Sequence, residues 1–178
     1  MKYKLTGLLA LALMSMAAAN AEITASSPDG FELKLEKTSL LAPAELYDRV
    51  GEISEWWSAP HTYSGAAENL YITKLDPGGV WLEDWSDGRV EHGRVIARTI
   101  NGEEHMLRFE APLGPLQAMG VNAVLTVTIT PDTDETTPEE SVVSFQYSVT
   151  GASFQQLDQI APAVDDVLSE QITNLATD

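Results

Sequence analysis

The strongest constraint on the fold is a change of hydrophobic period along the chain. From residue 69 to residue 150, apolar residues recur at every second position in short segments, which is typical of β-strands with one buried face. From residue 154 to residue 175 the spacing changes to three and four, which is typical of an amphipathic helix. A sheet with one apolar face needs a cover, and this helix carries the one long apolar stripe in the sequence. The pattern therefore predicts an α+β fold.

About seven strands are expected, most of them joined by tight turns. The turn signals are Asp76-Pro77-Gly78-Gly79, residues 86–88 and Asn101-Gly102, and such short connections make the sheet antiparallel. The expected strands are residues 31–37, 70–75, 80–85, 89–100, 103–110, 122–130 and 141–150.

Two short helices are expected between the first strand and the rest of the sheet. Ala42-Pro43-Ala44-Glu45 has a proline at the first helical position and an acid in the first turn. A second helix at residues 54–57 should be capped by Ser54. In the C-terminal stripe, which runs from Phe154 to Leu175, Pro162 must either kink the helix or begin a new one.

Residues 1–21 have the features of a cleavable export signal. Lys2 and Lys4 precede an apolar run from residue 5 to residue 19, and Ala19-Asn20-Ala21 has the small-x-small pattern of a cleavage site. The run is shorter than the roughly 20 residues of a stable membrane helix, and an uncleaved anchor is the alternative. We expect a periplasmic or secreted protein with a linker at residues 22–30 and one domain at residues 31–178.

The composition excludes several classes of partner and site. The chain of 178 residues has a formal net charge of −17, so it should repel nucleic acid and anionic membrane surfaces. It has no cysteine, hence no disulfide, cysteine-bound zinc or lipidated cysteine. The spacing of His61, His92 and His105 matches no metal motif, and the acidic segment 132–140 lacks the pattern of a calcium loop. No cofactor is expected.

The sequence contains none of the common enzyme motifs that we sought. It has neither a phosphate-binding Gly-x-x-x-x-Gly-Lys-Ser/Thr loop nor a Gly-x-Ser-x-Gly nucleophile elbow. Beside Arg94, His92 either orients a polar ligand group or is an ordinary strand histidine. An acid on a strand would serve as general acid or base if it were buried in a cavity with a raised pKa. The candidates are Glu83, Asp84, Glu91 and Glu110.

Tryptophans and one irregular loop point to a ligand cavity. Trp57 either seals the core or lines a pocket. Trp81 and Trp85 share a strand face that is either a cavity wall or a solvent-facing aromatic patch. Residues 111–120 are apolar, but their prolines and glycines keep them out of the sheet. This loop either gates a cavity or packs on the last helix.

The order of the motifs resembles a known superfamily. Trp56-Trp57, Pro77-Gly78-Gly79 and Gly93-Arg94-Val95 precede a long last helix, and together they span residues 31–176. This order is similar to the START/Bet v 1-like superfamily, also called SRPBCC, and within it to the branch of the C-terminal domain of the Hsp90 ATPase activator. The resemblance implies a helix-grip fold with a hydrophobic ligand cavity, but no single activity. The export signal and a last helix without tryptophan depart from that branch.

The resemblance also implies a position for the cavity, between the last helix and the concave face of a curved sheet. The Gly-x-Val pattern of the superfamily points inward, so Gly93, Val95 and Ala97 should leave space there. Val95→Trp should then fill that space at a modest cost in stability. The other residues expected to line the cavity or its mouth are Trp57, Trp81, Leu107, Phe109, Leu116, Met119, Leu157, Ile160, Val164 and Leu168.

These observations favour an exported binding or carrier protein for a small apolar or amphipathic molecule. An enzyme of the cyclase or hydratase kind, with a cavity carboxylate or histidine, is the first alternative. The second is a cochaperone-like module that binds a protein partner through an exposed face. An acid that points inward from the strand of Trp81 and Trp85 would favour the enzyme.

Overall fold

The structure, a computed structural model, describes residues 22–132 and 140–177. The expected export signal and most of the acidic segment 132–140 lie outside these residues. The strands are β1 (Glu22–Ser27), β2 (Gly30–Ser39), β3 (Leu70–Ile72), β4 (Val80–Trp85), β5 (Gly88–Asn101), β6 (Glu104–Glu110), β7 (Asn122–Pro131) and β8 (Ser141–Thr150). The helices are α1 (Pro43–Gly51), α2 (Ile53–Trp56), α3 (Leu116–Met119) and α4 (Ala161–Ala176), with 3-10 turns η1 (Ala59–His61), η2 (Ala67–Asn69), η3 (Ser153–Gln155) and η4 (Leu157–Gln159).

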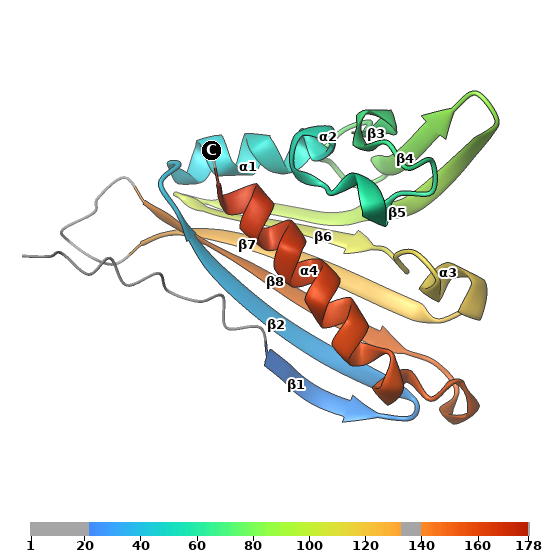
Figure 1. The fold of residues 1–178 in the computed structure, drawn as a ribbon. Coiled ribbons are helices and arrows are strands. Elements are labelled where there is room, and N and C mark those ends of the chain that lie inside the picture. Colours follow the sequence, from blue (N-terminus) through green and yellow to red (C-terminus); the bar gives the residue numbers. More distant parts are fainter. Residues whose placement is uncertain (1–21, 133–139, 178) are drawn as a thin grey trace, which may run out of the picture.

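The strands form one antiparallel sheet in the order β1-β2-β8-β7-β6-β5-β4-β3. Helix α4 crosses one face of this curved sheet, and its C-terminal end lies near α1 and α2 (Figure 1). The register of β2 against β8 is continuous, from Gly30 opposite Thr150 to Ser39 opposite Ser141. The expected α+β helix-grip fold is confirmed. Within the described residues, no helix is long and apolar enough to cross a membrane.

The sheet has one strand more than expected because residues 22–27, which we expected to be a linker, form β1. Every side chain of β1 is exposed, so no alternation of apolar residues marks it in the sequence. Pro28 and Asp29 form the turn into β2. Strand β3 ends at Ile72, earlier than the expected residue 75, although the Thr73 N–H still donates to the Val80 carbonyl at 3.0 Å.

The helices begin close to the expected positions. Helix α1 begins at Pro43, but α2 begins at Ile53, so the expected cap at Ser54 is wrong. Pro162 lies in the first turn of α4 and begins a new helix, one of the two alternatives. Phe154 precedes this helix in η3 and is 83% exposed, so it does not belong to the apolar stripe.

Two glycine motifs that carried the superfamily resemblance meet in the sheet. The Gly78 N–H donates to the Val95 carbonyl at 2.9 Å, and the Val95 N–H donates to the Gly79 carbonyl at 2.9 Å. Gly78 has a φ of +86°, which favours glycine there. The turn between β3 and β4 is therefore fastened to the middle of β5.

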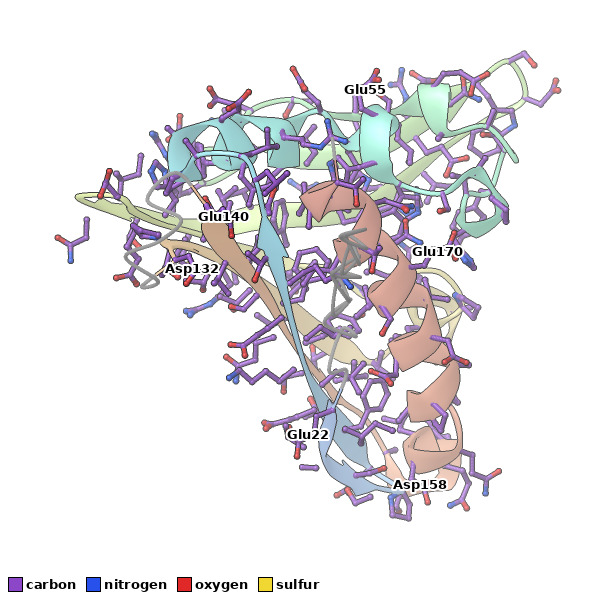
Figure 2. The ribbon with its side chains drawn as sticks, turned by 60° about the vertical axis from the view of Figure 1, so that its left-hand side comes forward. Glu22, Glu55, Asp132, Glu140, Asp158 and Glu170 are labelled. Carbon is purple, nitrogen blue, oxygen red and sulfur yellow. The ribbon has the colours of Figure 1, made fainter. Side chains whose placement is uncertain are left out.

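The core fills the space between the sheet and the C-terminal half of α4. Arg49 links α1 to the end of this helix, because its guanidinium donates to the carbonyls of Leu175 at 3.1 Å and Thr177 at 2.8 Å. Acidic side chains such as Glu22, Glu55 and Glu140 lie on the periphery (Figure 2). The fully buried core side chains include Phe31, Leu33, Leu35, Phe145, Tyr147, Leu168, Ile172 and Leu175.

Candidate functional site

A cavity of about 620 Å³ lies where α4, the segment after α2 and the loop 112–118 meet. This volume lies within the range of small-molecule sites. The walls are mostly apolar, and the polar side chains that reach them are those of His61, Thr62 and Tyr63. The cavity therefore suits an apolar or amphipathic molecule.

Helix α4 supplies one wall of the cavity. The side of the helix that faces the loop carries Val164, Val167 and Leu168, which are at positions i, i+3 and i+4. Ile160, just before the helix, extends this wall. These side chains lie beside the loop 112–118, and Leu168 is also part of the buried core.

Trp57 forms a rigid second wall. Its indole N–H donates to the His61 carbonyl at 3.0 Å, and its ring meets the Trp81 ring edge to face, with centroids 4.8 Å apart. Trp57 is buried in the core and also lines the cavity, so it has both of the roles that we considered for it.

The loop 112–118 is fastened to the sheet and to the segment opposite. The Tyr147 hydroxyl donates to the Ala111 carbonyl at 2.8 Å and accepts the Leu113 N–H at 3.2 Å. From the other side, the Tyr63 hydroxyl donates to the Gly114 carbonyl at 3.0 Å. Leu116 is buried in the cavity wall that faces α4. The loop thus packs towards the last helix and at the same time borders the cavity.

His61 stands at the cavity wall in a polar cluster with α4. Its Nε2 lies 3.1 Å from the Glu170 carboxylate, and the Ser58 hydroxyl donates to the same carboxylate. The hydrogen bonds from Ser58 and His61 hold the pKa of Glu170 below its ordinary value. The cluster fixes the orientation of His61 at the apolar cavity.

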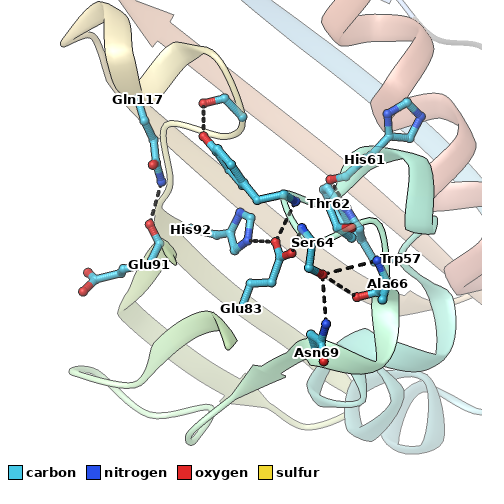
Figure 3. Close-up of polar contacts among 12 residues, drawn as sticks. Trp57, His61, Thr62, Ser64, Ala66, Asn69, Glu83, Glu91, His92 and Gln117 are labelled. Carbon is cyan, nitrogen blue, oxygen red and sulfur yellow. Dashed lines mark hydrogen bonds and ion pairs between the residues drawn. The ribbon is translucent and has the colours of Figure 1, made fainter. Parts of the chain in front are cut away.

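A second polar cluster surrounds a buried acid on β4 (Figure 3). The Glu83 side chain is 0% exposed, and its carboxylate accepts the backbone N–H groups of Tyr63 at 3.0 Å and Ser64 at 2.5 Å. The Nε2 atom of His92 lies 2.9 Å from the same carboxylate. The Asn69 amide donates to the Ser64 hydroxyl at 3.0 Å and supports this turn.

The hydrogen bonds decide the charge of this cluster. Burial alone would raise the pKa of Glu83, but the hydrogen bonds from Ser64, Tyr63 and His92 outweigh burial and lower the pKa. Burial lowers the pKa of His92, and the bond to Glu83 opposes this shift only in part. An ionised carboxylate therefore faces a neutral imidazole. We expected a buried acid to have a raised pKa, and in Glu83 the direction is the opposite.

A smaller hollow of about 330 Å³ lies along β5 and the end of β6. It is lined by His92 together with Glu91, Gly93, Arg94, Glu110, Pro112 and Gln117. The loop 112–118 borders both the hollow and the cavity, since Pro112 and Gln117 line the first while Leu113 and Leu116 line the second. The Gln117 amide donates to the Glu91 carbonyl at 2.5 Å and closes one side (Figure 3).

The structure brings together five of the predicted lining residues and places the others elsewhere. The five that line the cavity are Trp57, Leu116, Ile160, Val164 and Leu168. Trp81, Val95, Leu107, Phe109 and Leu157 are buried in the core and do not line the cavity, and Met119 packs against that core.

The small residues of β5 do not leave empty space at the cavity. A Cβ atom at Gly93 would lie 2.7 Å from the Glu110 carbonyl, so glycine permits a close approach of backbone here. Ala97 follows an irregularity in the pairing of β5 with β6 and is half-buried. The glycine at position 93 is explained by the close approach of the Glu110 backbone.

Residues 60–63 line the cavity, but they were not among the residues expected to line it. Pro60, His61, Thr62 and Tyr63 lie in a segment without hydrophobic period, so neither a strand nor a helix pattern pointed to them. The one available signal was their composition, an aromatic residue and a histidine directly after Trp56-Trp57. Among residues 22–132 and 140–177, no three possible metal-binding side chains come together.

Comparisons with known proteins bear on the fold. No family model matches the sequence, and no curated protein matches it. A protein from Thermobifida fusca, solved by NMR in solution, has a TM-score of 0.56 and 14% identity over 82% of this chain and 90% of that chain. Truncated norcoclaurine synthase from Thalictrum flavum has a TM-score of 0.52 and 12% identity, with 86% and 96% of the two chains covered.

The di-domain ARO/CYC protein StfQ from the steffimycin biosynthetic pathway has a TM-score of 0.53 and 11% identity. The match covers 84% of this chain and 50% of StfQ, so this chain spans about half the length of that protein. At such low identity, the similarity is informative about architecture alone. The chain therefore shares the helix-grip fold with these structures.

Proposed function

We propose that this protein binds a small apolar or amphipathic molecule in the cavity between α4 and the loop 112–118 and acts as its carrier. The observation that carries the proposal is the cavity itself, about 620 Å³ with mostly apolar walls. His61 and Tyr63 provide polar groups at one side, which suits a ligand with a single polar end. The net charge of −17 favours a neutral ligand over an anionic one.

The matched substitutions Ala163→Trp and Ala44→Trp test this proposal. Ala163 lines the cavity, whereas Ala44 is exposed in α1 and does not line it. Each alanine directly follows the proline in the first turn of its helix, so the two changes make similar demands on the backbone. Binding of N-phenyl-1-naphthylamine, a neutral fluorescent probe of apolar sites, is the measurement.

The parent and Ala44→Trp should bind the probe with equal affinity, and Ala163→Trp should bind it about tenfold more weakly or not at all. Thermal melts establish that both variants fold. Absence of probe binding by the parent contradicts the proposal, and so does equal binding by Ala163→Trp.

We also propose that the carrier acts outside the cytoplasm after cleavage between Ala21 and Glu22. The charged start, the apolar run and the Ala19-Asn20-Ala21 site support this. The intact mass of the exported protein should correspond to a chain that begins at Glu22. A mass that includes residues 1–21 would contradict cleavage.

We further propose that the chain is a member of the SRPBCC superfamily, in the branch of the Hsp90 ATPase activator C-terminal domain. The helix-grip fold supports the superfamily. The contact between Pro77-Gly78-Gly79 and Val95 supports the motifs on which the branch rests.

A further inference from the structure

Burial of the Glu83 carboxylate costs folding free energy, and the apolar cavity does not require this acid. Its carboxylate is fully buried, and within the described residues no lysine or arginine pairs with it. Burial of an ionised carboxylate is costly even when hydrogen bonds compensate for lost water. The backbone N–H groups of Tyr63 and Ser64 need an acceptor there, but a neutral acceptor such as glutamine would supply one without a buried charge. The arrangement around Glu83 therefore calls for a functional explanation.

The partner of Glu83 is a histidine with one nitrogen fixed and the other free. Because Nε2 of His92 faces an ionised carboxylate at 2.9 Å, the proton of the neutral ring lies on Nε2. The other nitrogen, Nδ1, is then an unprotonated acceptor, and no group of the described residues bonds to it.

The free nitrogen of His92 is not fully enclosed by the protein. His92 is 4% exposed and lines the hollow. Nδ1 of His105 is fully buried without a hydrogen-bond partner, whereas Nδ1 of His92 keeps some exposed surface. The rings of Trp81 and Tyr63 lie beside the imidazole, with centroids 5.5 Å and 5.7 Å away, and hold its plane.

We propose that His92 is a general base, which takes a proton through Nδ1 from a weakly acidic hydroxyl group, a phenol or an enol, of a small molecule bound in this hollow. Glu83 is the positioning residue: it fixes the proton of His92 on Nε2 and stabilises the imidazolium that forms. This is the role that the acid performs for the histidine in a catalytic triad.

The proton transfer balances without another reactant. The O–H bond of the ligand breaks, its electron pair stays on oxygen, and a new N–H bond forms at Nδ1. The proton on Nε2 stays there and faces the carboxylate of Glu83. The charged groups at the hollow are Glu91, Arg94 and Glu110, of which Glu91 and Arg94 form an ion pair. Arg94 is the cation among the residues that line the hollow, in which the oxyanion that develops would be bound.

The proposal is independent of the proposed carrier function. The hollow and the apolar cavity share no lining residue. Either one can therefore fail while the other stands. The substitution His92→Gln should leave the affinity for N-phenyl-1-naphthylamine unchanged, and this measurement separates the two.

The test uses 4-nitrophenol, because the visible absorption of its anion reports proton transfer directly. Bound to the parent protein, the phenol should ionise at a pH below that at which free 4-nitrophenol ionises. His92→Gln should abolish this shift. Glu83→Gln should lower the ratio of bound phenolate to bound phenol about tenfold, the equivalent of one unit in the pKa of His92, with less effect on the affinity. His105→Gln, which removes a buried histidine outside the hollow, should keep the shift.

A second measurement on the parent avoids any variant that fails to fold. Side-chain ¹⁵N NMR should find His92 protonated on Nε2 and unprotonated on Nδ1, and addition of 4-nitrophenol should move the Nδ1 resonance. A proton on Nδ1, or an Nδ1 resonance and a probe spectrum that remain unchanged at saturating 4-nitrophenol, would overturn the proposal.

Discussion

Glu83 and His92 give the folded state a definite response to acid. The folded protein holds the pKa of both groups below the ordinary values, 4.5 for the acid and 6.5 for the histidine, so in both cases the unfolded chain takes up the proton first. Stability falls as the pH is lowered wherever the unfolded state binds more protons than the folded state. For His92 the loss begins below about pH 6.5, and for Glu83 it continues below about pH 4.5. The two losses add.

The free energy of unfolding should therefore fall as the pH is lowered from neutrality, and His92→Gln should flatten the part of this decline that lies above about pH 4.5. Urea denaturation at several pH values measures this free energy. Parent and variant must be compared because protonation of the many surface acids also changes stability in both proteins, by reducing the repulsion between their negative charges. Identical pH dependence in the two proteins would show that His92 does not titrate as described.

At the scale of elements, β5 determines where the cavity ends. Val95 is 1% exposed, pairs with Phe109 of β6 and is bonded to the turn that contains Gly78 and Gly79. The sheet face around it is therefore filled, and the space for a ligand lies farther along α4, beside the loop 112–118. The sequence alone led us to expect that space at Val95.

Val95→Trp should consequently destabilise the protein by about 1–3 kcal/mol or more, because the core has no room for the added volume. Val95→Ala should destabilise it as well, since it leaves a void in a packed region. Urea denaturation of both variants tests the point. If Val95→Trp unfolds at the same urea concentration as the parent, the cavity extends under the sheet.

The elements that the sequence predicted well are those whose side chains alternate between core and solvent. In β8, Val143, Phe145 and Tyr147 are fully buried and the residues between them are not, so period two is visible in the sequence. Strand β1 was missed because all its side chains are exposed. An edge strand of this kind is held by backbone hydrogen bonds, which leave no side-chain pattern.

The site was predicted less well because long-range contacts create it. Backbone N–H groups of Tyr63 and Ser64 bind an acid about twenty positions away, and Ser58 binds Gln171 and Glu170 of α4. No local period predicts such contacts. The apolar stripe of α4 was enough to predict that this helix forms one wall. The residue at which the helix begins could not be predicted, because Pro162 was consistent with either a kink or a new helix.

At the scale of the whole molecule, α4 closes the fold. Leu168, Ile172 and Leu175 are completely buried against the sheet, and Arg49 of α1 depends on the end of this helix for its hydrogen bonds. The acids on the periphery keep the outer surface polar. Folding therefore hides a large apolar face under a single helix.

Truncation after Gly151 should expose that face and cause aggregation. Light scattering and thermal melts of the truncated and full-length chains measure this. A truncated chain that stays soluble and unfolds cooperatively would contradict the helix-grip account of stability.

If the apolar cavity holds a small molecule, native mass spectrometry of the protein purified from its own host should detect it. The protein is purified without detergent, in parent, Ala163→Trp and Ala44→Trp forms. We expect a one-to-one non-covalent adduct of small mass on the parent and on Ala44→Trp, and its loss from Ala163→Trp. A parent protein without an adduct, or an adduct that Ala163→Trp retains in full, would show that the cavity does not hold a small molecule.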